Sequence, residues 1–138
     1  MSAGDTGRRA VGRGFAVAVG CGDAATGLAL LAAPRALLAL LGIAVPAGGA
    51  FAFRFVGVFV ACVGFAYLYP WLPPATRRGA RMGAAIEWTA GVRLAVASFL
   101  AVAVAAGEPS GWLVVGFYDA AVALAQLWLC AGGCFDAA

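Results

Sequence analysis

Four long apolar runs fill most of this chain and limit the folds that it can adopt. None of the runs contains more than two charged residues, and they span residues 12–33, 51–69, 82–106 and 111–130. The hydrocarbon core of a bilayer is about 30 Å thick and is crossed by about 20 helical residues. Each run is therefore long enough to cross a membrane as an α-helix. The sequence predicts an all-α integral membrane four-helix bundle.

The composition excludes a soluble fold of this length. The chain has 138 residues, of which 64% are hydrophobic and 11% are charged, whereas soluble domains are about 25% charged. Small soluble domains bury only about two-thirds of the surface that their unfolded chains expose, so much of this apolar surface would remain in water. We expect one transmembrane domain over residues 12–132, preceded by a disordered cytoplasmic N-terminus over residues 1–11.

A short helix is predicted between the first and second crossings. Pro34 ends the first crossing, and proline is favoured in the first turn of a new helix. Gly42 suits the residue that ends this helix. The segment Arg35–Leu41 is apolar but too short to span the bilayer, so we expect it to lie at the membrane interface.

Arginine placement predicts the topology. Six arginines flank the N-terminus or the connection between the second and third crossings, namely Arg8, Arg9, Arg13, Arg77, Arg78 and Arg81. The opposite side has only Arg35 and Arg54. Because basic residues collect on the cytoplasmic side, both termini are predicted to be cytoplasmic in a multi-pass protein of a bacterial inner membrane. An aromatic belt is expected near the inner face, made of Tyr67, Tyr69, Trp71, Trp88 and Trp128.

Several chemistries find no support in the sequence. The chain has no histidine, which excludes imidazole ligation of a haem, and no CxxC motif to suggest a zinc framework. We predict no metal site, no cofactor and no catalytic residue, although enzymatic activity is left open. The net charge of +3 does not indicate nucleic-acid binding, because several arginines lie inside the apolar runs. Cys21 and Cys62 are expected to be small packed residues, whereas Cys130 and Cys134, one helical turn apart, leave a thiol function open.

Charged residues inside the crossings are the candidates for a functional site. An ionisable residue at mid-membrane costs about 3 kcal/mol on insertion scales and normally faces the bundle interior, paired with another. Three of these charges share a helical face with small residues, which mark helix contacts in membranes. Gln126 lies on the same face as one of them. The candidate ligand-binding or buried charge network comprises Asp23, Arg54, Glu87, Arg93, Asp119 and Gln126.

Depth along the helices predicts which charges pair. Asp23, Arg93 and Asp119 fall near the middle of their crossings, so Arg93 is expected to contact Asp23 or Asp119. Arg54 lies in the outer third of its helix and either bonds the other acid or reaches outward. Glu87 is six residues from Arg93, about 240° around the helix, so the two side chains point in different directions. One of them is expected to face the bundle, and the other to reach toward the inner interface or a second subunit. The charges either fix helix register as ion pairs or form a polar site for a small molecule, a proton or a quinone-like headgroup.

The order of motifs resembles a known family. The first crossing runs into Leu31–Gly42, with Pro34 and Arg35 inside it, and the second begins with Phe53–Phe59. The second crossing ends in a Tyr/Pro segment, Glu87 and Arg93 follow on the third, and Tyr118 precedes Asp119 on the fourth. Residues 12–130 thus resemble the DoxX-like small four-helix bacterial membrane proteins. The resemblance implies a left-handed four-helix bundle and transfers no catalytic residue. Some relatives are membrane components of thiol or quinone redox systems, and distant ones bind sterol-like lipophiles between acidic residues.

Three functions remain open at this point. The first is an accessory or structural component of a membrane complex. The second is a binder or carrier of a small lipophilic or quinone-like molecule at the centre formed by Asp23, Arg93 and Asp119. The third is a membrane component of a thiol/quinone redox system. The expected partners are the lipid bilayer, a membrane-protein partner or a second copy of the chain, and a small lipophilic ligand, but no nucleic acid.

Overall fold

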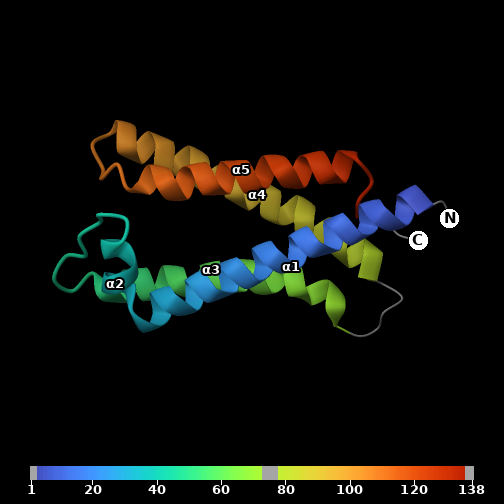
Figure 1. Ribbon diagram of the computed structural model, residues 1–138. Helices are drawn as coiled ribbons and strands as arrows, with labels where there is room; N and C mark the ends of the chain where they lie inside the picture. The colour runs from blue at the N-terminus through green and yellow to red at the C-terminus, as the bar shows by residue number, and fades with distance from the viewer. Residues whose placement is uncertain (1–2, 73–77, 136–138) are drawn as a thin grey trace.

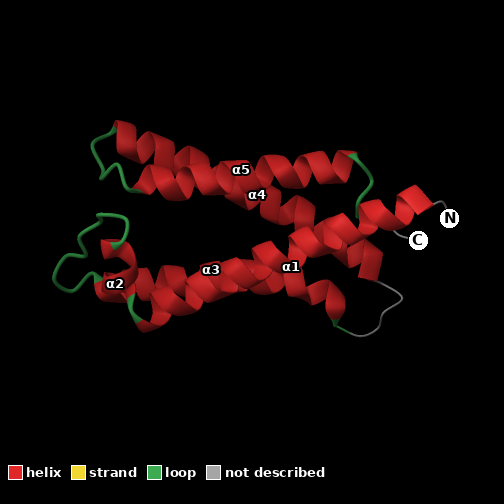
Figure 2. Ribbon diagram, in the orientation of Figure 1, coloured by secondary structure: helices red, strands yellow, loops and turns green. Residues whose placement is uncertain are grey.

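The computed structural model describes residues 3–72 and 78–135, which are helical apart from turns and short connections (Figure 2). The helices are α1 (Ala3–Ala32), α2 (Pro34–Ala39), α3 (Ala50–Leu68), the 3-10 helix η1 (Tyr69–Trp71), α4 (Arg78–Ala105) and α5 (Trp112–Ala131). Four candidate membrane spans are present in this part of the chain, at Thr6–Ala32, Ala50–Trp71, Arg81–Ala105 and Trp112–Ala131. The prediction of four apolar helices long enough to cross a membrane is confirmed, which indicates a multi-pass membrane protein.

The long helices pack as two pairs. Helix α1 lies along α3, and α4 lies along α5 (Figure 1). Glycines allow α1 and α3 to approach closely. A Cβ atom built on Gly20 would lie 2.7 Å from Tyr67 Cβ, and one on Gly57 would lie 2.8 Å from the carbonyl oxygen of Gly27. Larger side chains at these positions would separate the two helices.

Two apolar clusters join the pairs at opposite ends of the molecule. Near the chain termini, the terminal-end cluster contains buried side chains from all four long helices and the segment after α5: Ala16, Tyr67, Met82, Ile86, Leu129 and Phe135. At the other end, the α2-end cluster is built on Leu30, Leu38 and Ile43. Beside it the ring of Phe53 stacks on that of Trp112, with centroids 6.2 Å apart. Along α1, Asp23 lies between the two clusters, so the polar site is enclosed by apolar contacts on both sides.

The short helix predicted after Pro34 is present. Pro34 occupies its first turn, and Gly42 adopts a φ of +68°, a left-handed conformation that favours glycine. The N–H of Ile43 donates to the carbonyl of Leu38 at 3.0 Å, which closes the turn that ends the helix. The helix covers Pro34–Ala39 rather than the predicted Arg35–Leu41.

The N-terminal segment packs against the end of the chain that follows α5. Disorder is predicted over residues 1–11, of which residues 1–2 lie outside the described part of the chain, and α1 begins at Ala3. The segment after α5 folds back against this helix, because a Cβ atom built on Gly12 would lie 2.8 Å from the carbonyl oxygen of Cys134. Phe135 is buried beside Ala16 in the terminal-end cluster. Composition alone could not reveal this contact between the two ends of the chain.

Large apolar side chains cover much of the outer surface. The most exposed include Phe51, Trp88, Phe99, Phe117, Leu124 and Trp128. Soluble monomers rarely expose apolar patches of this extent, whereas lipid accepts them. The outer surface therefore agrees with the composition in indicating a lipid environment.

Candidate functional site: a buried arginine held by two aspartates and a tyrosine

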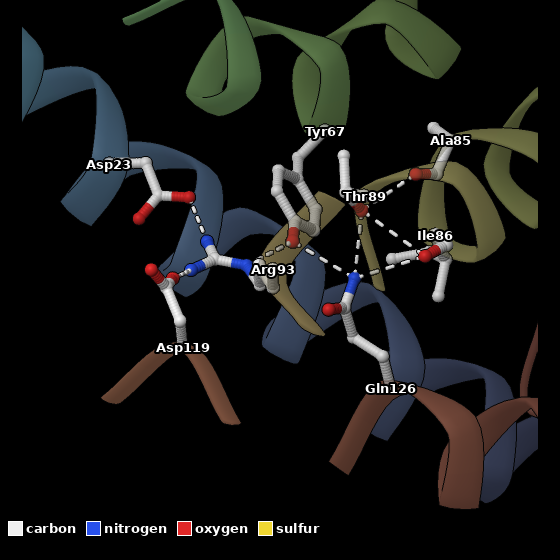
Figure 3. Close-up of polar contacts among 8 residues, drawn as sticks. All are labelled: Asp23, Tyr67, Ala85, Ile86, Thr89, Arg93, Asp119 and Gln126. Atoms are coloured by element: carbon white, nitrogen blue, oxygen red, sulfur yellow. Dashed lines mark hydrogen bonds and ion pairs between the residues drawn. The ribbon is translucent and has the colours of Figure 1, made fainter. Parts of the chain in front are cut away.

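Arg93 lies at the centre of the polar site (Figure 3). It is the middle residue of the candidate span Arg81–Ala105 and is 4% exposed. Its Nη2 donates to Oδ2 of Asp23 on α1, and its Nη1 donates to Oδ1 of Asp119 on α5. The prediction that Arg93 contacts Asp23 or Asp119 is confirmed, and Arg93 in fact contacts both.

Tyr67 supplies the third partner of the guanidinium. Nε of Arg93 donates to Oη of Tyr67 at 3.1 Å, and Tyr67 is fully buried on α3. All three nitrogens of Arg93 therefore have acceptors, and the acceptors come from the three other long helices. Tyr67 was predicted to belong to the aromatic belt at the membrane surface, and this assignment is wrong. The signal that could have placed it inside is its helical face, which it shares with Gly57 and Gly64.

Gln126 extends the network toward the end of the molecule that carries the chain termini. Its Nε2 lies 2.9 Å from Oη of Tyr67, 2.8 Å from Oγ1 of Thr89 and 3.2 Å from the carbonyl oxygen of Ile86. Oγ1 of Thr89 in turn donates to the carbonyl of Ala85 at 2.7 Å. Sequence reasoning selected Gln126 but missed Thr89, which is four residues before Arg93 and therefore on the same face of α4.

One atom of the network has no partner. Oε1 of Gln126 is buried and accepts no hydrogen bond from any residue that the structure describes. A buried polar atom left unpaired costs about 1–3 kcal/mol.

Arg54 lies outside the polar centre. Its side chain is exposed, and its Nε donates to the carbonyl oxygen of Leu31 at 3.1 Å. Leu31 is in the last turn of α1, where carbonyl groups have lost their helical N–H partners because the helix ends before Pro34. Arg54 therefore caps the end of α1, and its predicted place in the buried charge network is not supported.

Glu87 also lies away from the centre. It is exposed on α4 and forms no ion pair within the described ranges 3–72 and 78–135. The structure thus brings together four of the six predicted residues: Asp23, Arg93, Asp119 and Gln126.

The centre carries an unbalanced charge. Two carboxylates share one guanidinium, which gives the group a formal charge of −1. The side chains of Asp23 and Asp119 are 8% and 13% exposed. The ring of Tyr118 lies beside the centre, with its centroid 5.5 Å from Cζ of Arg93, while about half of this residue remains exposed. Tyr118 therefore lies at the edge of the polar centre, on the side of α5.

The cysteines are not part of the polar centre. Cys21 and Cys62 have free thiols and are exposed, which corrects the expectation that they pack inside the fold. Cys130 is eleven residues after Asp119 on α5, about 16 Å along the helix axis. Among the described residues no group of three metal-ligating side chains is present.

No protein-family model matches this chain, and neither a curated protein nor a solved structure is detectably similar to it.

Proposed function

We propose that this chain is a four-helix transmembrane bundle that serves as an accessory or structural component of a membrane complex. Its polar centre fastens the two helix pairs. The observation that supports the proposal is the position of Arg93, whose guanidinium binds Asp23 of α1, Tyr67 of α3 and Asp119 of α5. Each of the three nitrogens of Arg93 has a partner inside the protein, and these bonds use three of the five N–H groups of the guanidinium.

The bonds between the two pairs are mainly polar at mid-membrane. Asp23 and Tyr67 belong to the α1/α3 pair, and both bind Arg93 of the α4/α5 pair. Gln126 of α5 adds a second contact to Tyr67. In lipid no hydrophobic force drives helices together, so packing and interhelical hydrogen bonds hold them. Removal of the polar bonds would leave the two apolar end clusters as the main connection between the pairs.

The proposal includes the location and relatives of the protein. Both termini are cytoplasmic in a bacterial inner membrane, α2 lies at the opposite interface, and the chain is a DoxX-like protein. The arginine distribution supports the orientation, and six residues are too few for α2 to cross the bilayer.

The test of an accessory role is the size of the native assembly. Membranes that contain the chain at its natural level are solubilised in a mild detergent and separated by native electrophoresis. The proposal predicts a band well above that of the purified chain, and crosslinking before solubilisation should preserve it. Migration as a single copy, with or without crosslinking, would contradict the accessory role. It would not contradict the role of the polar centre in joining the two helix pairs.

A second function, binding of a small lipophilic molecule, is favoured by the unpaired Oε1 of Gln126 and the formal charge of −1 at the centre. Both would accept a donor such as the hydroxyl group of a lipophile or of a reduced quinone. Organic extraction of the purified protein, followed by mass spectrometry, tests this function. A bound species present in one equivalent and lost in Gln126→Leu would support it, whereas an extract containing only bulk lipid would exclude it. The distance of Cys130 from Asp119 gives no support to a thiol/quinone redox role.

A further inference from the structure

A groove of about 420 Å³ lies where the start of α1 meets the end of α5. It is lined by Arg8, Trp128, Ala131, Gly132 and Cys134. The start of α1 and the end of α5 lie at the same end of the molecule (Figure 1), and no residue of the polar centre lines the groove. It combines one cationic side chain with a mostly apolar wall.

The fold fixes the position of Arg8. Gly12 packs against Cys134, and Arg8 is four residues earlier on the same face of α1. This spacing directs Arg8 toward the end of α5. Arg8 forms no ion pair or hydrogen bond with another residue in the described part of the chain. The groove therefore contains a cation at a defined position that forms no ion pair with any residue in the described ranges 3–72 and 78–135.

The end of α5 does not oppose an anion there. A helix C-terminus usually disfavours negative charge, because its last carbonyl groups are unpaired. Three of these carbonyls accept backbone N–H groups from the following turn: Gly132 donates to Trp128 at 3.0 Å, Gly133 to Cys130 at 2.9 Å and Cys134 to Leu129 at 3.0 Å. Among the residues that line the groove, Arg8 is the charged one.

The depth of the groove matches the lipid headgroup region. Arg93 is the middle residue of its span and binds Asp23 and Asp119, which places both acids near the bilayer midplane. Trp128 is nine residues from Asp119, roughly 14 Å along the helix and close to the hydrocarbon boundary. Arg8 is fifteen residues from Asp23, roughly 22 Å along the helix, which is the depth of the phosphate groups.

We propose that this groove binds an anionic phospholipid, with Arg8 bound to the headgroup phosphate and Trp128 against the first carbons of an acyl chain. A guanidinium suits a phosphate because it can form two parallel charged hydrogen bonds. Tryptophan is enriched at this depth because its ring has an apolar body and a polar N–H group. The inference requires only that the four apolar helices span a membrane, so it is independent of the accessory role.

Native mass spectrometry of the intact chain tests the proposal. The protein is purified in a non-ionic detergent and titrated with phosphatidylglycerol or phosphatidylcholine at physiological ionic strength. One phosphatidylglycerol should be retained in preference to phosphatidylcholine. Because the lost bonds involve charged groups, Arg8→Gln should weaken its binding by about tenfold. Quenching of tryptophan fluorescence by acyl-brominated phosphatidylglycerol should decrease in Trp128→Leu.

Arg13→Gln is the matched control, since Arg13 is an exposed arginine of the same helix that does not line the groove. Its effect on lipid binding should stay within about twofold, because salt screens charges beyond about 8 Å. Inorganic phosphate at millimolar concentration should not displace the lipid. Equal losses in the two variants, full binding by Arg8→Gln, or displacement by inorganic phosphate would overturn the proposal.

Discussion

Asp23 and Asp119 bind the two terminal nitrogens of the same guanidinium, that of Arg93. Asp119 is on the helix that pairs with α4, whereas Asp23 is on the other pair. The bond to Asp119 therefore lies within one helix pair, and the bond to Asp23 joins the two pairs. One arginine can bind two carboxylates because its two terminal nitrogens each carry N–H donors, and the two bonds have different structural roles.

Close packing of α1 on α3 predicts strong sensitivity at Gly27. A Cβ atom at this position would lie 2.7 Å from the carbonyl oxygen of Gly57 and closer still to the backbone of Ala61. Gly27→Ala should lower the free energy of unfolding by about 1–3 kcal/mol, the usual range for overpacking. Gly22→Ala is the control, because Gly22 is on the same helix with open space around it. Equal stability of the two variants in a detergent unfolding titration would contradict this packing.

Tyr67 should contribute through its hydroxyl group. Tyr67→Phe removes the acceptor of Nε of Arg93 and of Nε2 of Gln126. With both donors buried, we expect a loss of about 1–3 kcal/mol in the free energy of unfolding. Tyr69→Phe serves as the control, because Tyr69 is half exposed and its ring, which contacts Arg81, is retained. If both substitutions change the stability equally, the buried hydroxyl has no special role.

The arginine distribution predicts the orientation in the membrane. Reporter fusions at Met1 and Ala138 should both read as cytoplasmic. A cysteine introduced at Gly48, in the connection between α2 and α3, should react with an impermeant thiol reagent added from outside. These labelling experiments need a background in which the natural cysteines are replaced by alanine. A periplasmic signal from either terminus would contradict the proposed topology.

Much of the helical framework could be predicted because lipid imposes a length on each apolar run. Helices, the proline break before α2 and the depth of Arg93 all follow from residues close together in the sequence. The predictions failed where distant segments meet. The packing of Phe135 near Gly12 joins segments that are far apart in the sequence, and the burial of Tyr67 depends on the surface of α1 against which α3 lies.

The candidate site shows the same limit. Spacing identified Asp23, Arg93 and Asp119 as charges at one depth, which was enough to predict their contact. Spacing could not separate these residues from Arg54, whose small-residue neighbours also suggested an interior position. The structure assigns Arg54 to a carbonyl in the last turn of α1, a partner that exists only because α1 ends next to the start of α3.

The most direct test of the central claim is the stability of variants of the polar centre. Arg93→Leu leaves two carboxylates without a cation and should lower the free energy of unfolding by about 3 kcal/mol or more. Asp119→Asn keeps an acceptor for Nη1 and leaves one carboxylate for one guanidinium, so its effect should be within about 1 kcal/mol of the wild type.

The decisive measurement is the reversible unfolding of these proteins in mixed detergent micelles, monitored by circular dichroism. The triple variant Arg93→Leu/Asp23→Asn/Asp119→Asn is measured in the same way. Because the triple variant contains no unpaired charge, it should recover much of the stability lost in Arg93→Leu. If the polar centre joins the two helix pairs, Arg93→Leu should lose much of its free energy of unfolding and the triple variant should recover it. Wild-type stability of Arg93→Leu would contradict this role of the polar centre.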